Sequence, residues 1–251
     1  MDEAIEKAAA WLEAAGPGRV TVLTGAGIST DSGIADYRGP QGAWTKDPEA
    51  ERMATLRDYL DDPEVRKRAW RGRTTSPAWT AEPNAGHRAI VDLQTTGRLH
   101  SVVTQNVDGL HQKAGIADDK TIELHGNMHS TVCWTCGDRR PMAEAIARVT
   151  QEHDEDPRCR VCGGILKSAT ILFGEQLDPA VLAKAQAAAD EAEVFVAAGS
   201  TLVVHPAASL VPRAKRNGAT LIIANQEETP YDRIADAVLR GSLSTVLPSI
   251  L

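Results

Sequence analysis

The four cysteines of the chain form two C-x-x-C pairs, Cys133/Cys136 and Cys159/Cys162. This spacing lets two thiolates turn toward one ion, so the two pairs supply the four soft ligands of a tetrahedral zinc site. Two disulfides, or buried thiols without a partner, are the alternatives, although nothing else in the sequence indicates an oxidising compartment. A shell of four thiolates is closed, so we expect a structural zinc ion and a catalytic centre elsewhere.

A second candidate site follows the short β-branched segment Val20–Thr24, which runs into Gly25-Ala26-Gly27. A strand that ends in glycines and feeds a helix presents backbone N–H groups to a phosphate. The signal is weak alone and departs from the dehydrogenase fingerprint, because Thr30 stands where the third glycine belongs. No acidic residue closes a second strand about 20 positions further on. An ordinary hydride-transferring dehydrogenase is therefore disfavoured.

Two of the seven histidines, His125 and His111, lie in polar clusters where an imidazole could act as a general base. A neutral imidazole near pH 7 accepts a proton without being permanently charged. His111 lies three residues after Asp108, and its alternative role is to pack or cap on its own helix. A lone histidine is usually structural, which we expect for His87, His100, His129, His153 and His205.

Strands that alternate with helices must position these residues. Apolar runs predict strands at Val20–Thr24, Leu99–Thr104, Thr121–Leu124, Thr170–Phe173, Val194–Ala198 and Ala219–Ala224. Helical patterns cover Ile5–Leu12, Met142–Gln151, Asp178–Ala189 and Pro206–Arg216. The alternation predicts an α/β fold with a Rossmann-like, doubly wound, mostly parallel sheet.

Two segments interrupt this alternation and are read as insertions. Residues 41–83 are polar and rich in arginine and tryptophan, and residues 126–167 carry the cysteines. We expect them to form a smaller lobe, made of a helical insertion and a zinc ribbon. Residues 1–40, 84–125 and 168–251 then form the Rossmann-like domain.

Bulk properties exclude several classes of protein. The net charge of −7 argues against a nucleic-acid partner held by phosphate contacts. A composition of 42% hydrophobic and 24% charged residues suits a soluble globular protein. No run approaches the roughly 20 apolar residues that span a bilayer, and the acidic start Met1–Glu6 is unlike a signal peptide. We expect a cytoplasmic protein that does not bind membranes.

The stretch Gly25–Gly39 is more specific than its glycines, and reads GAGISTDSGIADYRG. It resembles the signature of the sirtuin family of NAD-dependent protein deacylases, G-A-G-x-S-x-x-S-G-I-P-D-F-R-G. Two further blocks agree, TQNVDGLH at Thr104–His111 and ELHGN at Glu123–Asn127. The cysteines follow His125 where the family places its zinc ribbon. Later family landmarks are matched by Phe173-Gly174-Glu175, Gly199-Ser200-Thr201 and Asn225.

The resemblance covers essentially the whole chain and implies both activity and cofactors. NAD is the co-substrate, and the zinc ion is structural. The acyl oxygen of an acylated lysine attacks the NAD ribose as nicotinamide leaves, and the products are free lysine and 2′-O-acyl-ADP-ribose. The resemblance selects His125 as the base that accepts a proton from a ribose hydroxyl, with Asn106 and Asp108 beside it. Partners would be acylated lysines of proteins, with metabolic enzymes such as acyl-CoA synthetases among them.

The resemblance also assigns binding residues. NAD would contact Gly25, Ala26, Gly27, Ile28, Asp36, Tyr37, Arg38, Gln105, Asn106, Asp108, Gly199, Ser200, Thr201 and Asn225. The peptide would lie between the lobes as an added strand beside Ile171, Leu172, Phe173 and Gly174. The alternative for each adenosine-side residue is that it belongs to an ordinary loop and has no binding role.

Departures from the family pattern affect the substrate side. Ala35 and Tyr37 replace proline and phenylalanine, and Lys167–Thr170 stands where many relatives carry a basic–Pro–Asp segment. A tyrosine and an arginine three residues apart mark relatives that prefer succinyl or malonyl groups, and here Trp70 and Arg73 hold those positions. Arg73 could pair with an acyl carboxylate, or belong to a helix whose arginines are solvated. Deacetylation is the leading hypothesis; removal of acidic or long acyl chains is the alternative.

Two other functions stay open from the sequence. A mono-ADP-ribosyltransferase would use the same NAD site and pass ADP-ribose to protein. A non-catalytic sensor of NAD or ADP-ribose would use the zinc lobe for docking, but the intact set Asn106, Asp108 and His125 argues against it.

Overall fold

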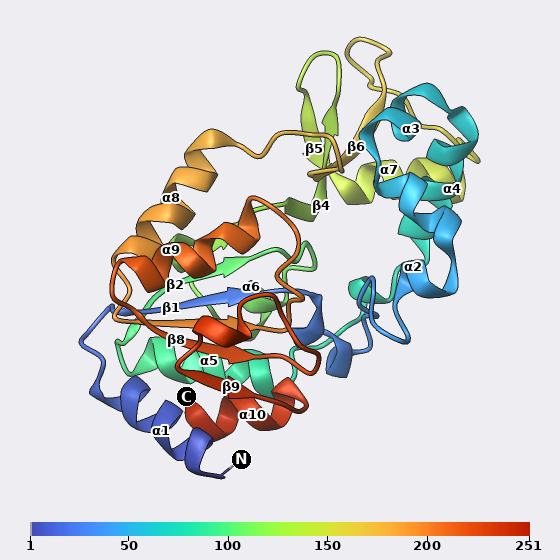
Figure 1. Ribbon diagram of the computed structural model, residues 1–251. Helices are drawn as coiled ribbons and strands as arrows, with labels where there is room; N and C mark the ends of the chain where they lie inside the picture. Colours follow the sequence, from blue (N-terminus) through green and yellow to red (C-terminus); the bar gives the residue numbers. More distant parts are fainter. Residues whose placement is uncertain (1) are drawn as a thin grey trace.

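Six parallel strands form the central sheet, in the order β3-β2-β1-β7-β8-β9 (Figure 1). The computed structural model describes residues 2–251. The strands are β1 (Val20–Thr24), β2 (Leu99–Thr104), β3 (Thr121–Glu123), β7 (Val194–Ala198), β8 (Thr220–Ala224) and β9 (Ala237–Leu239). Every neighbouring pair runs parallel, which confirms the predicted doubly wound sheet.

Helices cover both faces of this sheet. On one face lie α1 (Asp2–Ala14), α5 (Ala85–Thr95) and α10 (Leu243–Ile250), and on the other α8 (Pro179–Asp190) and α9 (Leu210–Arg216). Successive strand residues alternate between the two cores: Val22 packs in the first and Leu23 in the second. Burial on both faces explains why the strands are continuous apolar runs instead of alternating ones.

The remaining helices around the main sheet are short. They are α6 (Leu110–Ala114) and the 3₁₀ helices η1 (Ala26–Ile28), η2 (Thr30–Ser32), η5 (Asp118–Lys120), η6 (Ala207–Ser209) and η7 (Asp232–Ile234). Within residues 2–251, no helix has both the length and the apolar character that crossing a membrane requires.

A smaller lobe stands beside the carboxyl ends of the strands (Figure 1). Its antiparallel sheet has the order β5-β4-β6, formed by β4 (Gly126–Cys133), β5 (Arg139–Pro141) and β6 (Leu166–Thr170). The other elements of the lobe are α2 (Ala43–Lys46), η3 (Pro48–Ala54), α3 (Leu56–Asp61), α4 (Pro63–Thr74), η4 (Pro77–Trp79) and α7 (Met142–Gln151). Trp70 of α4 and Met142 of α7 pack with Cys133 and Cys159, so the helical insertion and the ribbon share one core.

One predicted strand is wrong. The segment Thr170–Phe173 does not join the main sheet, because the chain forms β6 four residues earlier and pairs it antiparallel with β4. Beyond β6, Phe173 instead makes an isolated parallel bridge to Thr55 of the helical insertion. The predicted domain boundary at residue 167 consequently falls inside β6. An apolar run signals a strand but not the sheet to which the strand belongs.

Candidate active site

A cavity of about 1050 Å³ lies between the carboxyl ends of the main-sheet strands and the small lobe. Its position agrees with the rule that open α/β sheets bind ligands beyond the carboxyl ends of their strands. Predicted site residues that line it are Gly25, Ala26, Gly27, Asp36, Tyr37, Arg38, Arg73, Gln105, Asn106, His125, Ile171, Leu172, Phe173, Gly174, Gly199, Ser200, Thr201 and Asn225. Three predicted residues do not line it: Ile28, Asp108 and Trp70.

The glycine turn after β1 differs from the expected helix start. The chain makes the two single-turn 3₁₀ helices η1 and η2, so this turn does not begin a long helix. The Gly27 N–H donates to the Gly199 carbonyl at 2.8 Å. A Cβ atom on Gly27 would lie 2.8 Å from Gly199 Cα, and one on Gly199 would lie 2.6 Å from the Ile28 nitrogen. These glycines therefore let two strand-end loops touch backbone to backbone beneath the cavity.

A chain of hydrogen bonds ties Asn106 to Asp108. The Asn106 amide donates to the Gly25 carbonyl at 3.1 Å and to Ser29 Oγ at 3.2 Å. Ser29 Oγ donates to Asp108 at 2.7 Å, and the Leu110 N–H donates to the other carboxylate oxygen at 2.9 Å. Asp108 is buried and reaches the cavity only through Ser29 and Asn106. The sequence analysis missed Ser29, although the serine of the GAGIS stretch was a signal that could have found it.

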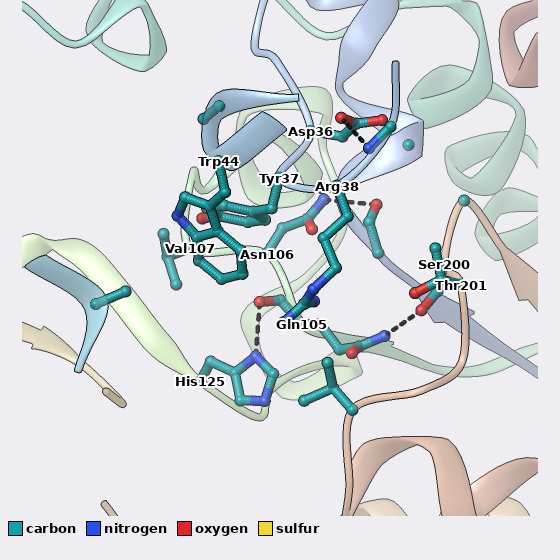
Figure 2. A pocket seen from close by; sticks show the side chains of 18 of the residues that line it. Asp36, Tyr37, Arg38, Trp44, Gln105, Asn106, Val107, His125, Ser200 and Thr201 are labelled. Atoms are coloured by element: carbon teal, nitrogen blue, oxygen red, sulfur yellow. Dashed lines mark hydrogen bonds between the residues drawn. The ribbon is translucent and has the colours of Figure 1, made fainter. Parts of the chain in front are cut away.

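One ring nitrogen of His125 is hydrogen-bonded, and the other has no hydrogen bond to any described residue. Its Nδ1 lies 3.0 Å from the Gln105 carbonyl oxygen (Figure 2). A carbonyl only accepts, so Nδ1 carries the ring proton and Nε2 keeps a lone pair. Burial lowers the pKa of His125, and the hydrogen bond to Gln105 partly opposes this. The ring is neutral at pH 7, the state that a general base requires.

His111, the rival candidate, has a different environment. It is wholly buried, its Nε2 lies 2.9 Å from Thr24 Oγ1, and it does not line the cavity. Burial lowers the pKa of His111 to about 3. These observations favour His125 as the base and leave His111 to another role.

Polar and aromatic side chains shape the rest of the cavity. Gln105 Nε2 donates to Ser200 Oγ at 3.0 Å, which links the ends of β2 and β7. The Arg38 guanidinium lies 4.6 Å from the Trp44 ring centroid, and its side chain extends toward Gln105 and His125 (Figure 2). Trp44 also stacks on Tyr37, with ring centroids 4.7 Å apart. Trp44 was absent from the sequence-based site because its neighbours in the chain carry no binding motif.

The predicted peptide-binding segment is already partly hydrogen-bonded. The Ile171 N–H donates to the His125 carbonyl at 2.9 Å. Phe173 donates to the Ala54 carbonyl at 2.7 Å and accepts from the Leu56 N–H at 2.9 Å. Gly174 makes no hydrogen bond with any residue that the structure describes. Among the described residues, the Ile171 carbonyl likewise accepts no hydrogen bond, so an added strand could pair at Ile171 and at Gly174.

Trp70 and Arg73 of α4 face different surroundings. Trp70 has no exposed surface and packs in the core of the small lobe. The Arg73 guanidinium lies 4.7 Å from the Trp70 ring centroid and lines the cavity. Its polar contacts are long, 3.4 Å to the Tyr59 hydroxyl and 3.5 Å to Ser168 Oγ. Arg71, by contrast, points outward and pairs with Glu155. Arg73 thus faces the cavity and Arg71 faces solvent.

The four cysteines converge on one point outside the cavity. Their Sγ atoms all lie within 4.8 Å of one another, and all four thiols are free. The Cys133–Cys162 and Cys136–Cys159 sulfur separations are 3.5 Å and 3.7 Å. A tetrahedral zinc ion with Zn–S bonds of about 2.3 Å places its sulfurs about 3.8 Å apart. The donor set and its spacing fit a structural zinc ion.

Comparison with known proteins agrees with this geometry. A model of the Sir2 family matches residues 25–206. The NAD-dependent protein deacetylase 2 of Streptomyces coelicolor is 52% identical over 232 residues, which are 92% of this chain and 96% of that protein. The NAD-dependent protein deacetylase 1 of Pyrobaculum aerophilum is 42% identical over 232 residues, which are 91% of this chain and 87% of that protein.

Solved structures of Sir2 proteins have the same fold. One from work on the mechanism and regulation of Sir2 enzymes superposes with a TM-score of 0.89 at 38% identity, covering 100% of this chain and 97% of that one. Another, which holds a deacetylated peptide and 3′-O-acetyl-ADP-ribose, has a TM-score of 0.89 at 31% identity, covering 98% and 96%. A third, bound to an acetylated peptide, has a TM-score of 0.84 at 30% identity, covering 97% and 95%.

Proposed function

The chain belongs to the Sir2 family and is an NAD-dependent protein deacylase, and we propose that His125 is the general base of its reaction. Bound NAD supplies the ribose carbon that the acyl-lysine oxygen attacks while nicotinamide leaves. The observation that carries the proposal is the His125 Nδ1–H bond to Gln105, which leaves Nε2 as the ring's basic atom. Nε2 then accepts a proton from a ribose hydroxyl.

Neighbouring residues would bind and orient the co-substrate. The Gly25–Gly27 turn brings the backbone close to the cavity and suits the pyrophosphate, and Arg38 lines the same cavity as a cation. Asn106 is held from two sides, which fixes its amide for contact with the nicotinamide end. Asp108 supports that orientation through Ser29. The residues Gly199, Ser200, Thr201 and Asn225 would line the adenosine half.

The test of the base is deacetylation of an acetyl-lysine peptide by His125→Ala, with NAD, followed by mass spectrometry. General bases contribute about 10² to 10⁴ in rate, so kcat should fall by about that factor and acyl-ADP-ribose should disappear. His100→Ala is the matched control, because His100 lies on the same sheet outside the cavity. Turnover by His125→Ala at the native rate would refute the assignment. ADP-ribosylated protein as the main product would instead indicate a transferase.

Acyl preference is a second question, raised by Arg73. We propose deacetylation as the main activity, with removal of acidic acyl groups as the alternative that Arg73 favours. A cavity-facing guanidinium with only long polar contacts can pair with a succinyl carboxylate. Native protein should be compared on acetyl, succinyl and long-chain acyl peptides. If the alternative holds, Arg73→Met loses succinyl turnover by more than about tenfold, while the outward-facing Arg71→Met keeps it.

The protein partners are acylated lysine side chains, and the family suggests metabolic enzymes such as acyl-CoA synthetases among them. We also propose a cytoplasmic location, because four reduced thiolates that bind zinc suit a reducing compartment. The division into a Rossmann-like domain and a small lobe is proposed with β6 kept whole, so that the ribbon ends at Thr170.

A further inference from the structure

Two buried histidines outside the cavity have one unpartnered nitrogen each. His87 of α5 and His111 of α6 have at most 1% of their surface exposed, and their ring centroids lie 5.1 Å apart. Within the part of the chain that the structure describes, His87 Nε2 and His111 Nδ1 have no hydrogen-bond partner. Burying a polar atom without a hydrogen-bond partner costs free energy, so the presence of two such nitrogens needs an explanation.

The surrounding hydrogen bonds decide which nitrogen of each ring carries the proton. The Asn84 N–H donates to His87 Nδ1 at 3.4 Å, so the proton of the neutral ring must be on Nε2. Thr24 Oγ1 donates to Thr104 Oγ1 at 2.9 Å, and therefore accepts from His111 Nε2 at 2.9 Å. His111 consequently has its proton on Nε2 and a lone pair on Nδ1. The two unpartnered atoms are therefore complementary: His87 Nε2 is a hydrogen-bond donor and His111 Nδ1 is an acceptor.

The series of hydrogen bonds from His111 through Thr24 to Thr104 continues to the active site through one peptide group. Thr104 Oγ1 also accepts from the Asn106 N–H at 3.1 Å. That N–H belongs to the peptide unit whose carbonyl, on Gln105, accepts from Nδ1 of His125 at 3.0 Å. One peptide plane is thus held by the buried threonine on one side and by the proposed base on the other.

We propose that His87, His111, Thr24 and Thr104 are positioning residues that fix the Gln105–Asn106 peptide, and through it the tautomer of His125. The His87 Nε2–H donates to one buried water, which in turn donates to His111 Nδ1, and this gives the series of hydrogen bonds a single direction. The Asn106 N–H, held by Thr104, polarises the peptide and makes the Gln105 carbonyl a stronger acceptor for His125. The chain touches no substrate and does not enter the cavity.

Two observations argue against simple core packing. A pair of apolar side chains would fill the same volume without two unpaired nitrogens. The hydroxyls of Thr24 and Thr104 are likewise both buried, and both bond along this one path. The link to reaction rate rests on the proposed role of His125, whereas the protonation pattern stands independently of it.

The first test is nitrogen-15 NMR of the histidine rings in the native protein. Protonated and bare ring nitrogens have distinct signals, so each tautomer is read directly. We expect the proton on Nδ1 of His125 and on Nε2 of both His87 and His111. A proton on Nδ1 of His111, or on Nε2 of His125, would overturn the proposal without any variant.

The second test compares Thr24→Val with Thr21→Val. Both threonines are wholly buried in β1, but the Thr21 hydroxyl donates to the Ala188 carbonyl, away from the site. Thr24→Val should lower kcat about five- to tenfold, the effect of one lost buried hydrogen bond, with KM values for NAD and peptide nearly unchanged. The His125 signals should then include the other tautomer, whereas Thr21→Val should keep the native signals and kcat.

The outcomes separate the two proposals. Identical kcat and His125 signals in Thr24→Val and Thr21→Val would refute the positioning chain while leaving His125 as the base. Native activity in His125→Ala would refute the base, but the ring signals would still test the chain.

Discussion

At the scale of single residues, burial and one hydrogen bond separate the roles of three histidines. His125 lines the cavity and keeps a free Nε2, whereas His87 and His111 are sealed beneath it. Burial lowers the pKa of His87 to about 4, although Asp108 opposes the shift and Arg88 adds to it. The pKa of His111 falls to about 3, because of burial and its neighbour His87. All three rings are therefore neutral in the folded protein at pH 7.

These low pKa values predict a loss of stability in mild acid. Below the unfolded pKa of 6.5 the unfolded chain binds protons that the native rings refuse, so the unfolding free energy falls as pH falls from 6.5 to about 4. Each ring contributes at most about 1.4 kcal/mol per pH unit. Urea unfolding at pH 7 and pH 5 measures the difference.

Carboxylates do not explain such a loss, because hydrogen bonds to Arg213 and, against burial, to Lys215 hold the pKa values of Asp190 and Asp236 below the ordinary aspartate value of 3.8. Their contribution is present above that value and is lost only as pH falls below it. A His111→Asn variant should show a shallower pH dependence. Equal unfolding free energies of the native protein at pH 7 and pH 5 would contradict the prediction.

At the scale of elements, the small lobe depends on contacts between its two insertions. Arg66 of α4 is buried, and its Nε lies 3.0 Å from an Asp156 oxygen in the ribbon. Its guanidinium also donates to the Tyr59 and Leu60 carbonyls, at 3.0 Å and 2.8 Å. One side chain thus joins α4 to the neighbouring helix α3 and to the ribbon, 90 residues further along the chain.

Removing this arginine should destabilise the fold strongly. Arg66→Ala leaves the Tyr59 and Leu60 carbonyls without this donor, and leaves the largely buried Asp156 carboxylate with Arg158 as its remaining partner. Each buried polar group left unsatisfied typically costs about 1–3 kcal/mol. Arg57→Ala is the control, since Arg57 pairs with Asp61 on the surface and such pairs contribute at most about 1 kcal/mol. Denaturant unfolding compares the two variants. Equal losses would show that the buried contact adds nothing beyond a surface pair.

Zinc removal acts on the same lobe. Cys133 and Cys159 belong to the core around Trp70, so the metal site and the hydrophobic packing are one structure. Structural zinc sites contribute about 10–16 kcal/mol to folding, and we expect chelation to abolish ordered packing of this lobe and deacylase activity together. Near-ultraviolet circular dichroism, zinc content and activity should be followed in one titration. Zinc-free protein that stays folded and fully active would refute the structural role.

At the scale of the whole molecule, the cavity is built by both parts of the chain. Loops of the main sheet, such as 199–205, form one side, and the segment 41–54 of the helical insertion contributes the other. The Phe173 bridge to Thr55 connects the segment 171–174, the proposed peptide-binding strand, with this insertion. Ligands in the cavity should therefore act on both lobes at once.

Hydrogen exchange tests this coupling. NAD together with an acetyl-lysine peptide should slow exchange in residues 41–54 and 199–205 in parallel, because a ligand that contacts both segments stabilises both against local opening. Residues of α1, which lies away from the cavity, serve as the internal reference. Protection confined to the main-sheet loops would show that the small lobe takes no part in binding.

The sequence by itself determined the local features of this protein. The cysteine spacing, the glycines after β1 and the apolar strands each depend on neighbours within a few residues, so they were readable without a fold. The motif blocks identified the family for the same reason.

Only the tertiary structure decided which distant segments meet. It moved the strand near Thr170 to the small sheet, replaced the helix expected after Gly27 with two short turns, and placed Trp70 in a core instead of the cavity. It also showed that Asp108 accepts a hydrogen bond from Ser29, and that His111 is linked through Thr24 and Thr104 to the peptide beside His125. Such contacts join residues tens of positions apart, and their energies depend on burial and direction, which no local pattern encodes.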